Sequence, residues 1–428
     1  MVISFAPHVC RVGDIQFSSE NPPEPNDKIR TTLEPWLSAI LQSEHLSLLF
    51  GNGLTTAATL FSGGTAGSMD SAITLSEDVL NEQYEAEVIS SAERIGRGVP
   101  NIEDYLRVAM TLEAGLRIAG DNRAEIVSDA VTESLTQLIS SILAAEATIK
   151  KGEFSEDNAS SDLTPMGYLV SLLLTFASRT PNRDRLHIFT TNYDRLVEFI
   201  CEVAGVRIID RFVGTLRPRF RASRMDIDLH YNPSGVRGEP RFLEGVVRLT
   251  KLHGSLDWTS EEAGILRLPI EFGAQSEPSP ASVLIYPNAA KDQETAYYPY
   301  AELFRDLSAA VCRPNSVVVT YGYGFGDDHI NRILADMLTI PSTHLMIISY
   351  DDAGGKVERF ARIHGNSSQL SLLIGSHFAD LRTLVDTYLP RPSIDDISWR
   401  RAALLRNRSV PSIGDLPSEA DESVVDNN

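Results

Sequence analysis

The chain has 428 residues, of which 43% are hydrophobic and 22% are charged, and its formal net charge is −20 at pH 7. This length suffices for one large or two medium domains with a substantial core. The negative charge argues against a protein that binds nucleic acid over its whole surface, because phosphate contacts need concentrated lysine and arginine. No run of about 18 apolar residues occurs, so no membrane span is expected.

The first 32 residues are expected to form an N-terminal arm, because the proline-rich segment 21–27 cannot continue a helix. The start of the chain has no basic region followed by an apolar run, so no secretory signal is expected. The three cysteines, Cys10, Cys201 and Cys312, are far apart. They suit a reducing cytoplasm and cannot form a four-cysteine zinc site, so we expect no metal.

The first predicted strand, residues 46–50, leads into a Gly-Asn-Gly turn and a helix start. Glycines let a backbone approach a pyrophosphate closely, and a helix N-terminus attracts anions. The alternative is a sharp strand-to-helix connection without a ligand. The candidate ligand-binding residues of this turn are Gly51, Asn52, Gly53 and Thr55.

A helical insertion is predicted between the first and second strands, at about residues 65–180. This region contains no convincing strand, and the apolar residues from Ile126 to Leu143 recur at the 3.6-residue spacing of a helix. Asn101 can cap a helix whose third residue is Asp104.

Two later strands end in polar residues. Residues 186–191 precede Asn192 and Asp194, and residues 246–252 precede His253. Buried parallel strands deliver side chains to one crevice at their carboxyl ends. An amide both donates and accepts hydrogen bonds, and histidine can act as a base near neutral pH. The structural alternatives are a helix cap for Asn192 and a core position for His253.

We therefore predict that Asn192, Asp194 and His253 converge on one ligand. Ser255 follows His253 and is a candidate ligand-binding residue, whereas Trp258 is expected in the core.

A second glycine turn follows the predicted strand 316–321 and supplies Gly322, Tyr323 and Phe325 as candidate ligand-binding residues. Asp351 ends the next strand, where an acid can bind ribose hydroxyls or cap a helix, and we weigh these roles evenly.

The remaining strands are expected at 282–286, 344–350 and 370–374, and helices near 164–178, 193–204, 299–312, 328–338, 354–364 and 377–389. This alternation predicts an α/β fold with a Rossmann-like doubly wound parallel sheet over residues 33–390. Residues 391–428 are expected to form a C-terminal segment ending in an acidic disordered tail. The arginine-rich segment 207–224 is interpreted as a solvated loop or subunit contact, with nucleic-acid contact left open.

The two glycine turns and the segments Thr190–Asp194 and Lys251–Ser255, in this order, resemble the sirtuin-like family. They are most similar to its bacterial NAD-consuming branch, which is associated with antiphage defence. The resemblance implies an NAD glycohydrolase that releases nicotinamide and ADP-ribose. It implies that Asn192, Asp194 and His253 are catalytic residues, with Asn192 and Asp194 near the nicotinamide ribose and His253 as the base. Asn52, Thr55 and Gly324 depart from the family pattern, which has a small residue and two serines there.

Protein-deacylating sirtuins carry a four-cysteine zinc module, so the resemblance is to a zinc-free branch. It also implies a cytoplasmic homo-oligomer and a partner in trans such as a HerA-type ATPase. Two alternative functions for the same crevice are left open. One is a non-catalytic module that senses NAD or ADP-ribose. The other is a nuclease or ADP-ribosyl transferase that contacts its substrate through the arginine-rich segment.

Overall fold

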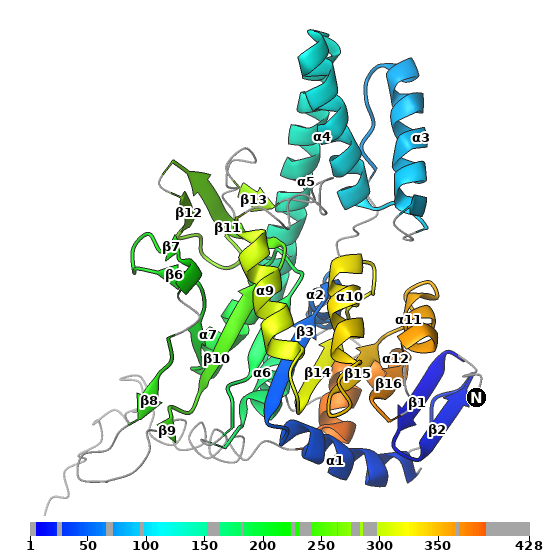
Figure 1. Ribbon diagram of the computed structural model, residues 1–428, viewed down its shortest axis with the longest axis vertical. Helices are drawn as coiled ribbons and strands as arrows, with labels where there is room; N and C mark the ends of the chain where they lie inside the picture. The colour runs from blue at the N-terminus through cyan, green and yellow to red at the C-terminus, as the bar shows by residue number, and fades with distance from the viewer. Residues whose placement is uncertain are drawn as a thin grey trace, which may run out of the picture.

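The computed structural model describes residues 6–23, 28–65, 72–94, 98–151, 163–180, 183–223, 227–231, 241–262, 264–274, 283–285, 298–364 and 368–390. These residues build a large central sheet covered by helices, a smaller second sheet, and a three-helix projection that extends away from the sheet (Figure 1).

The central sheet has nine strands in the order β2-β1-β16-β15-β14-β3-β4-β10-β5. Their bounds are β1 His8–Val12, β2 Ile15–Ser19, β3 His45–Phe50, β4 His187–Thr190, β5 Arg207–Ile209, β10 Val246–Lys251, β14 Ser316–Tyr321, β15 His344–Ser349 and β16 Leu370–Ile374. The strands from β16 to β5 pair in parallel. The strand order reverses between β3 and β14, and open α/β sheets bind ligands at such a switch point.

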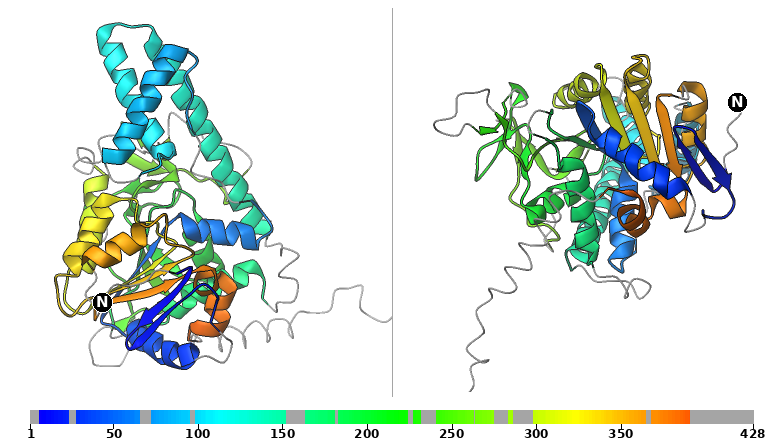
Figure 2. Two further views of the ribbon diagram at one scale, coloured as in Figure 1. Left: turned by 90° about the vertical axis from the view of Figure 1, so that its right-hand side faces the viewer. Right: turned by 90° about the horizontal axis from the view of Figure 1, so that it is seen from below.

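Helices cover both faces of this sheet (Figure 2). One face packs against α1 Lys28–Leu41, α2 Asn52–Phe61, α6 Pro165–Ala177, α7 Leu196–Ala204, α12 Ser376–Ala379, α13 Leu381–Thr383 and η3 Leu384–Tyr388. The other packs against α9 Tyr300–Val311, α10 Asp328–Met337 and α11 Lys356–His364. Leu46 and Leu48 lie in the first core and Leu49 in the second, as the two-residue period of a strand requires. The predicted doubly wound α/β fold is confirmed.

A second, antiparallel sheet has the order β13-β11-β12-β7-β6. Its strands are β6 Phe212–Val213, β7 Arg219–Phe220, β11 Gly254–Glu261, β12 Gly264–Arg267 and β13 Val283–Ile285, and β8 His230–Tyr231 pairs separately with β9 Arg241–Phe242. The strand expected at 282–286 is present as β13, but it pairs antiparallel with β11 and so does not belong to the parallel sheet. Trp258 is buried against Phe212 in this region, as expected.

The projection consists of α3 Asp78–Arg94, α4 Ile102–Ala119 and α5 Arg123–Lys151. The predicted cap at its second helix is confirmed. The Asn101 side chain accepts from the backbone N–H of Glu103 at 3.0 Å and of Asp104 at 3.3 Å, and Asp104 accepts from the Asn101 N–H at 3.1 Å. This reciprocal capping box fixes where α4 begins.

The N-terminal residues differ from the expected arm. Val9, Cys10 and Val12 of β1 are buried, and β1 pairs antiparallel with the edge strand β16. The proline-rich segment that suggested an arm begins after β2, so it does not prevent these two strands from forming. The tail predicted at 391–428 lies outside the described residues.

Candidate active site

Two glycine turns lie against each other at the carboxyl ends of β3 and β14. The Gly51 N–H donates to the Tyr321 carbonyl at 3.1 Å, and the Gly53 N–H donates to the Gly322 carbonyl at 3.0 Å. Gly322 has a φ of 62°, which favours glycine. A Cβ at Gly53 would lie 2.5 Å from the Gly322 Cα, and a Cβ at Gly322 would lie 2.5 Å from the Gly53 Cα. The close packing of the two backbones therefore explains why positions 53 and 322 are both glycine.

A cavity of about 200 Å³ lies beside the turns and is lined in part by α4 and α5 of the projection. The predicted site residues that line it are Gly51, Asn52, Thr55, Asn192, Asp194, His253 and Tyr323. Residues that were not predicted as part of the site also line it, among them Glu103, Leu138, Ile142, Tyr193 and Asp327. The strands and the projection therefore both contribute walls to one cavity.

Asn192 follows β4 and is bonded to the first glycine turn. Its Nδ2 donates to the Gly51 carbonyl at 3.0 Å and to the Thr55 Oγ1 at 2.9 Å. Its Oδ1 is buried and has no hydrogen-bond partner within the described ranges. An unpaired buried acceptor costs about 1–3 kcal/mol, so a donor on a ligand would stabilise it. The cap alternative is wrong, because α7 begins at Leu196 and Asn192 lies outside its first turn.

Asp194 is held from both sides. Its Oδ2 accepts from the Thr55 hydroxyl at 2.6 Å, and its Oδ1 accepts from the Leu196 N–H at 2.9 Å. Its backbone carbonyl accepts from the Nζ of Lys251, a buried cation that also pairs with Glu198 at 3.2 Å. Burial raises the pKa of Glu198, against the opposing effect of Lys251. Lys251 thus holds the backbone of the loop that carries Asn192 and Asp194.

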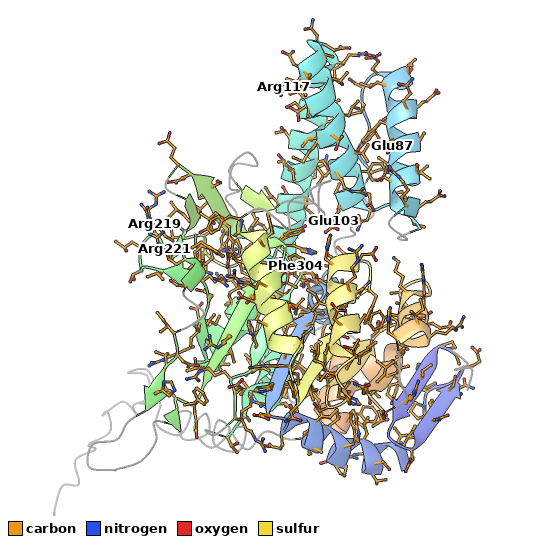
Figure 3. The ribbon with its side chains drawn as sticks, in the orientation of Figure 1. Glu87, Glu103, Arg117, Arg219, Arg221 and Phe304 are labelled. Carbon is orange, nitrogen blue, oxygen red and sulfur yellow. The ribbon has the colours of Figure 1, made fainter. Side chains whose placement is uncertain are left out.

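His253 follows β10 and lies between two carboxylates. Its Nε2 is 2.9 Å from the Asp327 Oδ2, and its Nδ1 is 4.0 Å from the Glu103 Oε1. A carboxylate only accepts, so in the neutral ring Nε2 carries the proton and Nδ1 is left as an acceptor. The Tyr193 hydroxyl donates to the same Glu103 oxygen at 3.2 Å. Glu103 lies at the base of the projection, close to α10 (Figure 3).

The predicted ligand-binding residues that do not line the cavity are Gly53, Ser255, Gly322, Phe325 and Asp351. The Ser255 hydroxyl is buried and donates to the Tyr193 carbonyl at 3.4 Å. Phe325 is buried in the second core. Asp351 is exposed and accepts from the Ala353 N–H at 2.8 Å, so the structure favours its role in a turn over ribose binding.

A buried ion pair fastens the projection to the loop after β4. The Arg195 Nη2 lies 2.5 Å from the Glu146 Oε2 on α5, and the Arg195 N–H donates to the Glu146 Oε1 at 2.8 Å. Glu146 also accepts from the Gly273 N–H at 3.0 Å. The insertion is therefore anchored next to Asn192 and Asp194.

Glu103 and Asp327 are the two carboxylates beside His253 that sequence reasoning missed. Each occupies a helix start that was recognised: Glu103 lies inside the capping box of α4, and Asp327 is the N-cap residue of α10. These signals fix local geometry, but they do not reveal that both helix starts face His253.

The arginine-rich segment does not act as one unit. Arg211 is buried and bonds to both carboxylate oxygens of Asp306, at 2.6 and 2.7 Å. Arg219 lies on β7 and Arg221 directly follows this strand; both are exposed and lie away from Glu103 (Figure 3). Arg224 lies outside the described residues. Nucleic-acid contact by this segment stays a prediction.

Asn192 and His253 thus meet at the carboxyl ends of parallel strands, beside two packed glycine turns. Residues 186–368 match the SIR2-like domain. This match supports a sirtuin-like family and implies NAD use, because SIR2-like domains are typically NAD-dependent enzymes. The SIR2-like match includes Asn192 and His253 but neither Gly51 nor Glu103. The comparison with curated proteins gives no match.

Two features are absent from the described part of the chain. It holds no group of three or more histidine, cysteine, aspartate and glutamate side chains that could bind a metal ion. None of its helices is both long and apolar enough to cross a membrane.

Proposed function

We propose that the chain is an NAD glycohydrolase that splits NAD into nicotinamide and ADP-ribose. The observation that carries the proposal is that Asn192 and His253 share one cavity, in which the Asn192 Oδ1 has no partner among the described residues. An amide in this position can orient a ribose hydroxyl or a carboxamide without adding charge. His253 presents Nδ1 as a base for the attacking water.

The charge of the cavity supports this substrate. Glu103, Asp194 and Asp327 line it together with His253, and no described lysine or arginine does. Carboxylates suit the cationic nicotinamide ring, and they stabilise the positive charge that develops on the ribose as the glycosidic bond breaks. A nucleic acid would place phosphates directly beside these carboxylates, whereas NAD places its cationic nicotinamide ring and ribose there, so the nuclease alternative is less well supported.

The size of the cavity indicates which part of NAD it holds. A volume of about 200 Å³ is below the roughly 300–1,000 Å³ of pockets that bury a whole drug-sized ligand. It fits the nicotinamide and its ribose. The start of α2 borders the cavity through Gly51 and Asn52. The N–H groups of Gly51 and Gly53 already donate to the carbonyls of Tyr321 and Gly322, so it is the positive end of the helix dipole that favours the phosphates here.

The test is nicotinamide release from NAD by the full chain, alone and with the protein encoded beside it. We expect His253→Ala and Asn192→Ala each to lower the rate by about 10²-fold or more, because each removes a positioned group. His364→Ala is the control, since His364 is exposed at the end of α11. Wild-type rates in both site variants would refute the assignment. A wild type that binds NAD without turnover would favour the sensing module.

The resemblance to the bacterial defence branch also supports a proposal for the role of this activity in the cell. There the enzyme would be a cytoplasmic homo-oligomer that depletes NAD during phage infection, with a HerA-type ATPase as its partner. Light scattering of the purified chain and NAD levels in infected cells test these points separately from the chemistry.

A further inference from the structure

We propose that Glu103, contributed by the helical projection, is a catalytic residue that holds the attacking water together with His253. The inference rests on the proposed NAD glycohydrolase activity and adds to it a residue outside the SIR2-like match. It assigns a chemical role to an insertion that otherwise only covers the cavity.

The distance between the two side chains carries the proposal. The His253 Nδ1 and the Glu103 Oε1 are 4.0 Å apart, which is too far for a hydrogen bond between them. In the neutral ring both atoms are acceptors, because Nε2 donates to Asp327. Two acceptors at this separation match one water molecule, which can donate to each at about 2.8 Å. Both side chains line the cavity, so a water between them faces the substrate.

Several contacts fix the Glu103 carboxylate in place. Tyr193 donates to its Oε1 at 3.2 Å, and the side chain is 13% exposed. The capping box of Asn101 holds the first turn of α4, and Ile102 anchors that turn in the core of the projection. The positive end of the helix dipole stabilises a negative charge at this position. Glu103 is thus preorganised before any substrate binds.

The reaction step follows from this arrangement. The bond between C1′ of the ribose and the nicotinamide nitrogen breaks, and its electron pair neutralises the cationic ring. The water oxygen forms the new bond to C1′ and its proton passes to the Nδ1 of His253, which releases it to solvent. The Glu103 carboxylate accepts the second hydrogen bond of the water and stabilises the positive charge on the ribose. The products are nicotinamide, ADP-ribose and one proton.

The first test compares Glu103→Gln with Glu113→Gln in the full chain. Glu113 lies on the same helix but pairs with Arg117. We expect Glu103→Gln to lower kcat for nicotinamide release by about 10²-fold or more. Its affinity for a non-hydrolysable carba analogue of NAD, measured by calorimetry, should stay near the wild-type value. Glu113→Gln should match the wild type in both measurements.

The second test separates a catalytic role from a structural one. Formate can occupy the space left in Glu103→Ala and replace its carboxylate, so added formate should restore at least part of the lost rate. A purely structural loss would not respond to formate. Wild-type kcat in Glu103→Gln, or an inactive Glu103→Ala that formate does not rescue, would overturn the role of Glu103 alone. A wild-type chain that releases no nicotinamide would overturn the proposed function and this inference with it.

Discussion

The packing of the two glycine turns can be tested by adding a single methyl group at Gly322. A residue with a Cβ at a φ of 62° costs about 1–2 kcal/mol. The Cβ would also lie 2.5 Å from the Gly53 Cα, 2.7 Å from the Gly53 carbonyl carbon and 2.8 Å from the Leu54 nitrogen. These are backbone atoms that cannot rotate away, and overpacking of this kind adds about 1–3 kcal/mol. Gly322→Ala should therefore lower the free energy of unfolding by about 2–5 kcal/mol.

The control for this substitution lies in the same turn. A Cβ at Gly326 would have nothing within 4 Å, so Gly326→Ala should change stability by no more than about 0.5 kcal/mol. Urea unfolding followed by far-ultraviolet circular dichroism measures both variants. Equal midpoints for Gly322→Ala and Gly326→Ala would refute the view that the turns depend on close backbone contact.

Three further predictions concern stability. Burial lowers the pKa of His344 to about 4, whereas an unfolded chain protonates this residue near pH 6.5. Between these two pH values the unfolded chain binds a proton that the folded protein excludes. The free energy of unfolding should therefore have its full value above about pH 6.5 and fall by about 3 kcal/mol as the pH drops to about 4. Urea titrations of His344→Asn should show a smaller decline. Glu146→Gln removes the charge opposite the buried Arg195 and should cost about 3–5 kcal/mol in chemical unfolding, a loss that Arg195→Met in the same chain should partly reverse. Deleting residues 2–23 uncovers the edge of β16 and should lower the thermal midpoint, and an unchanged midpoint would contradict a structural role for β1.

The fold was predictable because its signals are local. The apolar runs that became β3, β4, β10 and β14 are buried on both faces, so the sequence shows them as continuous hydrophobic segments. Asn192 and His253 could be paired from sequence for the same reason, since parallel strands end at one edge of the sheet.

What escaped prediction depends on contacts between distant segments. Glu103 lies 150 residues from His253 in the chain, and its direction is set by how the projection docks and not by the sequence around it. β1 is a short strand in which His8 and Arg11 alternate with apolar residues, and it joins the central sheet by pairing with β16, more than 350 residues later in the chain. The position of β13 likewise depends on β11, a strand from another part of the chain.

The long helix α5 has a mechanical consequence for the site. Its 29 residues span about 44 Å, and about 35 Å of this length lies between its start at the tip of the projection and Glu146. If the helix tilts by about 5° around Glu146, its far end moves by about 3 Å, whereas a group about 7 Å from the pivot moves by only about 0.6 Å. A displacement caused by a collision or a bound partner at the tip is therefore much smaller by the time it reaches Arg195. The loop that carries Asn192 and Asp194 is thereby shielded from small displacements of the tip of the projection.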